Sequence, residues 1–552
     1  MPSEQPFTGQ PGNRPEAGGD SDQVITRRLD RIEAWSRGVV LHLLWIAPAA
    51  AALALQFRRA FDGLYLSDAM DLGQIGRHLA AGQGFVTTFL RPVEVALYPQ
   101  IPAPEIYHAP LYPLLLGLVF NLLPQSDAVM AGVSAFFFFI TLPLIYLLAS
   151  RVFDRAGGIL AAVIFALSGQ ALAYAVSGLH VTLWAFLLTL TAYLLYGNAG
   201  SARRSVAAGA VFGLCWLTEY MTFALIAPAL IAAFYAAPER RLRHLGWFVV
   251  GLIAVMLPWW VRNYLLAHNP LFTLDNYVLV MFTRVHPGHT LFRIADASAL
   301  RLPALVAEEP WELLRKGLLG LGSAYRTIAP LVGLYVVGFF VIAIMRRLAG
   351  PRQNFLRAMV VLLLVSLGVI GAAHNPSAEL FFVLVPLIVV LCGGYFVVLA
   401  REWIRTTVGQ AAAVAIFVLI AAYPAFVSWA LPQPRGISDK ANLDYLRRTL
   451  PPNAVVVTDI PWAVAWYAQR PAVWLPLDWR DFQRVQRKIG VDAIYLSALL
   501  PSYPSSEQAL AWQRLYAERG VPPGFEPAAL PQPQEMLLLK APLRTPGETP
   551  SE

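Results

Sequence analysis

The sequence predicts a multi-span α-helical membrane protein that ends in a small α/β domain. Hydrophobic residues make up 57% of the 552 residues and charged residues only 14%, so too few polar side chains are present to cover a soluble protein of this length. About eleven apolar runs have the length of candidate membrane spans. Beyond residue 432 these runs give way to short β-branched segments that alternate with helical patterns, which is typical of an α/β unit.

The distribution of charge and of cysteine narrows the class further. The net charge is +8, but Lys and Arg occur in short clusters between apolar runs and not on one continuous stripe, so nucleic acid is not an expected partner. Cys215 and Cys392 both lie inside apolar runs. Neither a disulfide framework nor a cysteine metal site is therefore expected.

The first predicted span follows a polar N-terminal segment. Residues 1–25 are rich in Pro, Gly, Gln and Asp and have no apolar periodicity, which predicts a disordered cytoplasmic tail. The run GVVLHLLWIAPAAAALALQF comes next, and at about 20 residues it is long enough to cross a bilayer. Because no small-residue cleavage site separates it from FRRAF, we interpret it as an uncleaved span. The membrane domain is predicted to cover residues 26–431.

Further apolar runs continue the membrane domain. They cover residues 127–150, 157–175, 179–197, 205–219, 221–236, 245–266, 327–346, 356–374, 379–400 and 409–431. With the N-terminus in the cytoplasm, every even-numbered connection is expected to be basic, and these connections read RVFDR, SARRS, PERRLRH, MRRLAGPRQ and REWIRTT. The alternative is that residues 205–236 form one long helix, which would reverse the topology of everything after them.

An odd number of spans places the C-terminal domain, residues 432–552, outside the cytoplasm together with the long loops 57–126 and 267–326. The first outer loop holds two helical stretches. DAMDLGQIGRHLAAG is too short and too polar to span and is expected to lie at the membrane interface. APLYPLLLGLVFNLLP is about fourteen apolar residues long, a length that more often dips into the interface than crosses it.

Three stretches resemble a known family. SDAMDLGQIGRHLAAGQGF, YHAPLYPLLLGLVF and LPWWVRNYLLAHNPLF are similar, in their order and spacing, to motifs of bacterial polytopic glycosyltransferases of the GT-C superfamily, relatives of protein O-mannosyltransferases and of the lipid A aminoarabinose transferase. The resemblance covers approximately residues 40–400. It implies a GT-C-like membrane domain in the cell membrane and transfer of a hexosyl or pentosyl group from a polyprenyl phosphate to an extracytoplasmic lipid, glycan or protein.

The resemblance places the family's catalytic aspartate at Asp68. A partly desolvated carboxylate at the interface is chemically suited to accept the proton of an acceptor hydroxyl as that oxygen attacks the anomeric carbon. A single, inverting displacement follows, because the lipid phosphate is already a good leaving group. The alternative is that Asp68 only caps the helix that begins after it.

Asp71 is the second catalytic candidate. One helical turn from Asp68, it could share a proton or a divalent ion with that carboxylate, or it could simply be a first-turn acid that stabilises the helix dipole. The resembling family often has an acidic residue directly after the catalytic one, whereas Ala69 stands here. We therefore expect no metal site and no required cofactor.

The donor phosphate implied by the resemblance requires cations at the outer interface. His108 stands where some relatives carry Lys, and Arg262 ends a span on the outer side. The alternatives are an ordinary loop histidine and an interfacial anchor beside Trp259 and Trp260. The complete set of candidate substrate-binding residues is Arg77, Arg91, His108, Arg262, Asn263, Arg315 and Lys316.

Some positions depart from the resembling family. His180 and Val181 replace a frequent Glu-Pro pair, and Glu379 and Leu380 replace a frequent Arg-Tyr pair, so another cation binds the phosphate, or the donor differs, or activity is lost. Glu219 is an ionisable group near a membrane edge, which marks either a functional site or a water-facing position.

Two rival functions remain from the residues alone: a transporter or flippase of lipid-linked substrates, and a noncatalytic membrane subunit. Transporters are often built from internal repeats, and none is evident in the sequence. The long outer loops and the C-terminal α/β unit fit an extracytoplasmic catalytic surface better.

Overall fold

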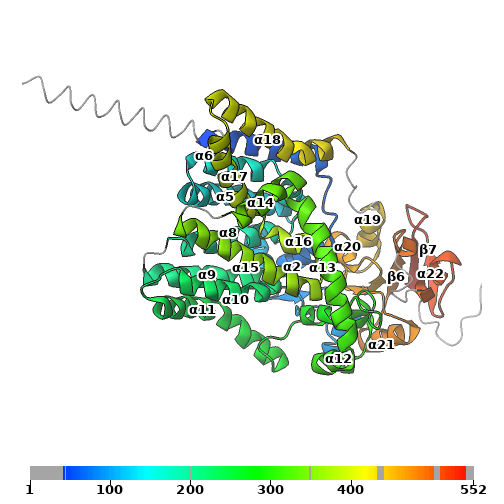
Figure 1. Ribbon diagram of the computed structural model, residues 1–552. Coiled ribbons are helices and arrows are strands. Elements are labelled where there is room, and N and C mark those ends of the chain that lie inside the picture. Colours follow the sequence, from blue (N-terminus) through cyan, green and yellow to red (C-terminus); the bar gives the residue numbers. More distant parts are fainter. Residues whose placement is uncertain are drawn as a thin grey trace, which may run out of the picture.

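The computed structural model describes residues 42–43, 45–197, 200–346, 350–431, 440–502 and 510–541. The tail predicted for residues 1–25 lies outside these ranges. A bundle of helices makes up one side of the molecule, and an α/β layer formed mainly by residues beyond 440 lies against the other side (Figure 1).

Within the described residues, five helices are long and apolar enough to cross a membrane. They are α5 (Asp127–Val152), α11 (Arg241–Ala267), α15 (Pro351–Ala373), α17 (Val385–Trp403) and α18 (Thr407–Ala430). A sixth span is possible by length if α6 (Arg155–Ala166) and α7 (Gly169–Ala175), which are bent by 63°, cross together. The count of about eleven spans stays a prediction.

The remaining predicted spans correspond to helices that lack the length or the apolar composition of a span. They are a helix over residues 45–60, α8 (Val181–Leu195), α9 (Ala202–Thr218), α10 (Ile226–Tyr235), α13 (Pro310–Val332), α14 (Leu334–Met345) and α16 (Ala378–Phe382). Residues 205–236 are not one continuous helix. Glu219 is extended (φ −153°, ψ 121°), and its side chain accepts a hydrogen bond from the Met221 amide at the start of the 3₁₀ helix η1 (Tyr220–Leu225).

Helices α9 and α11 pack closely because each presents a glycine to the other. A Cβ atom added at Gly209 would lie 1.9 Å from the Phe248 carbonyl oxygen, and one added at Gly251 would lie 2.1 Å from the Val206 carbonyl oxygen. Small residues that let two backbones approach are a common basis of helix association in membranes.

Replacing Gly251 with Val is expected to lower the free energy of unfolding in detergent by about 3 kcal/mol, because the new side chain forces α9 and α11 apart. Gly246 lies on the same helix and would have no atom within 4 Å of an added Cβ, so Gly246→Val is a matched control for helix propensity. Thermal unfolding of the two purified variants measures the difference. Equal unfolding temperatures would contradict the close approach.

The α/β layer is built on a six-stranded sheet in the order β2-β5-β4-β6-β8-β7. Its strands are β2 (Phe89–Leu90), β4 (Val456–Thr458), β5 (Ala472–Trp474), β6 (Ala493–Leu496), β7 (Phe525–Ala528) and β8 (Met536–Lys540). The first four strands in that order are parallel, and β8 is antiparallel to both β6 and β7. The predicted strand segments NAVVVTD, AVWLPLD and VDAIYLS contain β4, β5 and β6.

Helices cover this sheet and connect its strands. They are α19 (Lys440–Thr449), α20 (Pro461–Ala463), the π-helix η5 (Val464–Ala468), α21 (Trp479–Ile489), the 3₁₀ helix η6 (Leu500–Ser502) and α22 (Leu510–Ala517). The first outer loop contributes β2 to the sheet, with the Ala472 amide donating to the Thr88 carbonyl at 2.8 Å. The α/β layer is therefore joined to the membrane part by backbone hydrogen bonds.

The first outer loop also contains α2 (Ser67–Ala80), α3 (Pro92–Leu97), α4 (Leu111–Phe120) and a two-stranded ribbon of β1 (Val86–Thr87) and β3 (Ala103–Pro104). α2 was expected at the membrane interface, but residues 69–76 are all buried. It packs against α4, α20 and η5, so protein and not lipid surrounds it. At the crossing with α4, a Cβ added at Gly76 would lie 2.7 Å from Leu116 Cβ.

The second outer loop contains four short helices before α13 begins at Pro310. They are η2 (Leu274–Leu279), η3 (Thr290–Arg293), η4 (Ala297–Ala299) and α12 (Leu302–Glu308). Their apolar side chains form one cluster with Val93 and Ile106 of the first outer loop. The two outer loops consequently fold against each other.

Candidate active site

Asp68 lies at the start of α2, where the helix leaves its carboxylate largely free. The helix begins at Ser67, and its N-cap residue, Leu66, makes no side-chain capping bond. Asp68 accepts a hydrogen bond from the Ser67 hydroxyl at 3.3 Å, and in the described part of the chain no cation pairs with it. The interpretation of Asp68 as a simple helix cap is therefore not supported by the geometry.

The half-buried Asp68 side chain lines a cavity of ≈ 120 Å³ and an adjoining one of ≈ 50 Å³. Like Asp68, four other residues line both cavities: Tyr107, His180, Glu219 and Asp275. The larger cavity is lined in addition by His289, His374 and Glu379, together with several neutral residues. Side chains from both outer loops and from the ends of membrane helices thus meet around one polar space.

Two of the cavity carboxylates are paired with histidines. His180 Nε2 lies 2.9 Å from Glu219 Oε2, and His374 Nε2 lies 3.5 Å from Asp275 Oδ1. His289 is different, because burial together with the positive charges of Arg91 and Arg293 lowers its pKa to about 4. Its ring is neutral at physiological pH, so it contributes hydrogen-bonding capacity to the cavity and no charge.

Asp71 is buried behind the cavity wall, where both of its carboxylate oxygens are occupied. Oδ2 accepts from His108 Nε2 at 2.9 Å and from Arg91 Nη2 at 3.3 Å, while Oδ1 accepts from Gln74 Nε2 at 2.9 Å. Burial opposes the ionised form, but His108 and Arg91 outweigh it and lower the pKa of Asp71. The side chain is 2% exposed. This geometry does not fit a second base or a metal ligand shared with Asp68. The interpretation of Asp71 as a first-turn acid is also wrong, because the helix begins at Ser67 and Asp68 is the acidic residue of its first turn.

His108 is a cation beside the Asp68 carboxylate. Burial alone would lower its pKa, but Asp71, with smaller contributions from Glu105 and Asp68, raises the pKa to about 9. The imidazole therefore carries a positive charge at neutral pH. Its ring lines the smaller cavity beside Asp68, and its amide donates to Glu105 Oε1 at 2.7 Å, which fixes the loop.

Comparisons with known proteins show what the sequence and the fold of this chain are similar to. Residues 107–261 match the family model described as dolichyl-phosphate-mannose-protein mannosyltransferase. A search of the curated proteins found no match. Among solved structures, the oligosaccharyltransferase of Archaeoglobus fulgidus, tethered to an acceptor peptide containing the NVT sequon, has a TM-score of 0.55 at 13% identity, covering 90% of this chain and 74% of that one.

ArnT of Cupriavidus metallidurans is also similar. Its structure bound to undecaprenyl phosphate has a TM-score of 0.54 at 13% identity, covering 89% of this chain and 97% of ArnT, and its apo structure has a TM-score of 0.55 at 12% identity, covering 92% and 98%. These proteins are GT-C glycosyltransferases. The chain has the GT-C fold. The predicted resemblance to this superfamily is confirmed.

The other candidate cations of this GT-C chain lie outside the Asp68 cavity. Arg91 is buried between the rings of Phe89 and Tyr107, at 4.5 and 4.2 Å, and pairs with Glu94 at 3.1 Å as well as with Asp71. Its contacts are those of a buried structural arginine that orients Asp71.

Arg262 and Asn263 fasten the end of α11 to the outer loops. Arg262 Nη2 donates to the Glu105 carbonyl at 2.7 Å, and its guanidinium lies 4.7 Å from the Trp259 ring. Asn263 Nδ2 donates to the Phe272 carbonyl at 3.2 Å. These contacts fit the interpretation of Arg262 as an interfacial anchor.

Arg77, Arg315 and Lys316 are also separate from Asp68. Arg77 is nine residues further along α2, about half a turn around the helix axis, and lines a different polar cavity of ≈ 520 Å³ with Lys440 and Arg447. Arg315 pairs with Glu312 at 3.2 Å. Lys316 donates to the Val278 carbonyl at 2.6 Å, and burial lowers its pKa to about 7.

Sequence reasoning did not select Tyr107, Asp275, His289 or His374 for the site. Each lies in a loop or at a helix end, but they come from four separate segments. The one available signal was a histidine or carboxylate next to the outer end of a predicted span, as in HNPSAEL and PLFTLD. In the described ranges no group of three His, Cys, Asp or Glu side chains is arranged to hold a metal ion. The expectation that no cofactor is required stays a prediction.

Proposed function

We propose that this protein is a membrane glycosyltransferase that transfers a sugar from a polyprenyl-phosphate donor to an extracytoplasmic lipid, glycan or protein. The observation that carries the proposal is the cavity in which the unpaired Asp68 carboxylate lies beside the charged His108 ring. The reported complexes of GT-C proteins with undecaprenyl phosphate and with an acceptor peptide support a lipid-phosphate donor and an acceptor bound at the same fold.

In the proposed reaction Asp68 acts as the general base. It takes the proton of the acceptor hydroxyl while that oxygen forms a bond to the anomeric carbon. The bond between the anomeric carbon and the donor phosphate oxygen breaks at the same time, and its electron pair leaves with the polyprenyl phosphate. A single displacement inverts the anomeric configuration. His108 stabilises the negative charge that develops on the departing phosphate.

The histidine and carboxylate pairs of the cavity are suited to hold the sugar. The His180–Glu219 and His374–Asp275 pairs offer both donors and acceptors to hydroxyl groups. Glu379 lines the same cavity, in the position where relatives often carry arginine. His108 supplies the replacement cation in this proposal, which is why loss of that arginine is compatible with activity.

We further propose that the N-terminus is cytoplasmic and the C-terminal domain extracytoplasmic in the cell membrane. Contacts between the basic connections support this topology. Arg401 pairs with Asp154, Arg346 with Glu402 at 3.2 Å, and Ser205 lies 2.8 Å from His244 Nδ1. Of the five connections predicted to be cytoplasmic, RVFDR, MRRLAGPRQ and REWIRTT therefore meet in one group, and SARRS and PERRLRH meet in a pair.

The proposal is tested with the full chain, purified in mild detergent and supplied with a panel of synthetic polyprenyl-phosphate sugars. A polyprenyl phosphate is expected to copurify, and a glycosylated product with inverted anomeric configuration is expected by NMR. A product with retained configuration would contradict the single displacement. Movement of the lipid-linked sugar across a vesicle membrane without any transfer would favour the flippase instead.

A further inference from the structure

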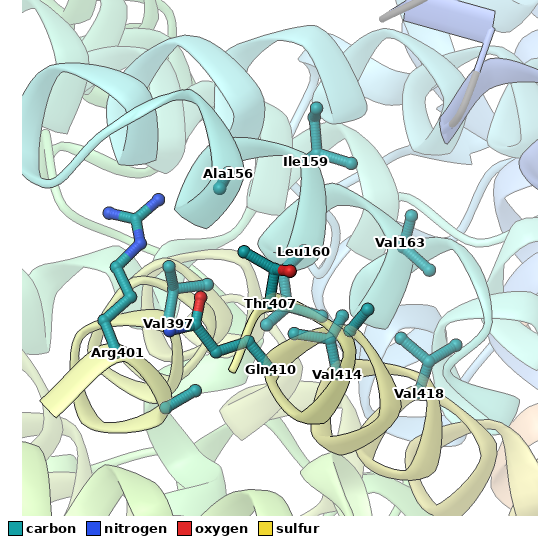
Figure 2. A pocket seen from close by; sticks show the side chains of 12 residues that line it. Ala156, Ile159, Leu160, Val163, Val397, Arg401, Thr407, Gln410, Val414 and Val418 are labelled. Carbon is teal, nitrogen blue, oxygen red and sulfur yellow. The ribbon is translucent and has the colours of Figure 1, made fainter. Parts of the chain in front are cut away.

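A further cavity lies within the membrane bundle, away from the Asp68 site. It has a volume of ≈ 350 Å³ and is formed between α6, α17 and α18 (Figure 2). Its lining residues are Ala156, Ile159, Leu160, Val163, Val397, Ala400, Arg401, Thr407, Gln410, Ala411, Val414 and Val418. The proposed transfer reaction uses none of them.

The cavity is apolar along most of its length and borders the outside of the bundle. α18 forms one wall, and only 22% of its most apolar stretch is buried inside the protein. Ile416 and Leu419 of this helix are exposed, as expected for a helix that contacts lipid. The cavity is therefore a groove beneath a lipid-facing helix.

Polar side chains gather at one end of the groove. Arg401 lies at one end in Figure 2, whereas Val163 and Val418 lie at the other. Along α18, Thr407, Gln410, Val414 and Val418 follow the i, i+3, i+7, i+11 spacing of one helix face. This face changes from polar to apolar in the direction of the chain, which is the layout of an amphiphile with one head and one tail.

The polar end carries an excess of positive charge. Asp154 at the start of α6 pairs with Arg401 at the end of α17, and Glu402 pairs with Arg346. The chain segments that supply these contacts contain five arginines in the described ranges, against the two carboxylates: Arg151, Arg155, Arg346, Arg401 and Arg405. Arg401 remains half exposed, and a guanidinium has five N–H donors, so one carboxylate does not saturate it.

The groove's polar end and the Asp68 site lie at opposite ends of α5. Asp127 at the start of this helix accepts a hydrogen bond from Trp466 Nε1 at 2.7 Å, beside α2. Val152 at its end is two residues from Asp154. A helix of 26 residues is about 39 Å long, which is sufficient to separate the two membrane surfaces.

We propose that this groove binds one phospholipid with an anionic head group from the leaflet opposite the Asp68 site. One acyl chain lies along the valines of α18, and the phosphodiester lies at the Arg401 end. Basic pockets between membrane helices are known to bind anionic head groups. The lipid would add contacts between α18 and the helices α6 and α17, since all three line the groove. The donor polyprenyl phosphate is a different molecule, on the other side of the membrane.

The test places the full chain in nanodiscs that contain equal amounts of phosphatidylglycerol and phosphatidylcholine, and measures by native mass spectrometry which lipid is retained on release. Wild type is expected to retain phosphatidylglycerol preferentially. Arg401→Gln is expected to reduce that preference about fivefold, and Arg401→Lys is expected to preserve most of it.

A second variant separates the groove from the general lipid surface. Val414→Trp fills the groove and is expected to abolish retention, while Ile416→Trp adds the same side chain to an exposed position of the same helix and is expected to retain lipid as wild type does. Equal retention by the two tryptophan variants, or no preference between the two lipids in wild type, would overturn the proposal. Displacement of the retained lipid by added polyprenyl phosphate would reassign the groove to the donor.

Discussion

Replacing Asp68 with Asn is expected to reduce kcat by about 10³-fold, the range over which a positioned general base contributes. The amide has nearly the same shape and can still accept the Ser67 hydroxyl bond seen at 3.3 Å, but it cannot take the proton of the acceptor hydroxyl. Single-turnover transfer from a radiolabelled polyprenyl-phosphate sugar measures the chemical step. The amount of donor bound before the reaction is expected to stay within about twofold of wild type, because the substitution removes no interaction that binds the donor in the ground state.

Two further variants decide what an Asp68→Asn result means. Asp62→Asn removes a carboxylate from the same outer loop, at an exposed position outside the Asp68 cavity, and is expected to react at the wild-type rate. Glu379 lines the same cavity as Asp68, so Glu379→Gln tests the rival base. Full activity of Asp68→Asn together with inactivity of Glu379→Gln would transfer the role to Glu379.

The parallel strands were predictable because their signal is local. β4, β5 and β6 are buried on both faces, and such strands read as continuous β-branched runs. β2 gave no comparable signal. It is two residues long and pairs with β5, which lies some hundreds of residues later in the sequence, so only the folded chain shows that the first outer loop extends the sheet.

The side chains of α2 show how much of a functional site can be predicted from the spacing of residues in the sequence. Helical periodicity places Arg77 about half a turn from Asp68, and this alone could have separated the two. By contrast, the partners of Asp71 come from residues 20 and 37 positions further along. No periodicity links them, and the resulting ion pairs decide that Asp71 is buried and saturated.

The interfacial placement of α2 was expected because the helix is only partly apolar. Burial of polar side chains inside protein is possible when each finds a partner, and here Gln74 bonds both Asp71 and Thr87 Oγ1, at 2.9 and 2.7 Å. Thr87 lies on another segment, as do Arg91 and His108, the charged partners of Asp71. A sequence therefore shows that the helix is amphipathic without showing whether lipid or protein covers it.

Donor affinity is expected to fall as the pH rises through about 9, the pKa to which Asp71 raises His108 against the opposing effect of burial. Because this pKa is raised above the ordinary value, the imidazolium is present below it and is lost above it. The KM for the polyprenyl-phosphate donor, measured across the neutral and alkaline range, is therefore expected to increase on the alkaline side. At neutral pH, His108→Gln is expected to raise that KM about 30-fold, because a charged hydrogen bond to the phosphate is lost.

The pH dependence of KM in Asp71→Asn tests whether Asp71 acts on the donor through the pKa of His108, which a purely structural role of Asp71 would not change. Without the carboxylate, burial acts on His108 with less opposition, so the alkaline increase in KM is expected to move to lower pH by at least about one unit. His108→Lys keeps a cation of high pKa in the cavity and is expected to restore affinity at neutral pH while moving the increase to higher pH. Thermal unfolding checks that both proteins are folded. If wild type and Asp71→Asn then show the same pH dependence of KM, His108 does not bind the donor phosphate through its charge.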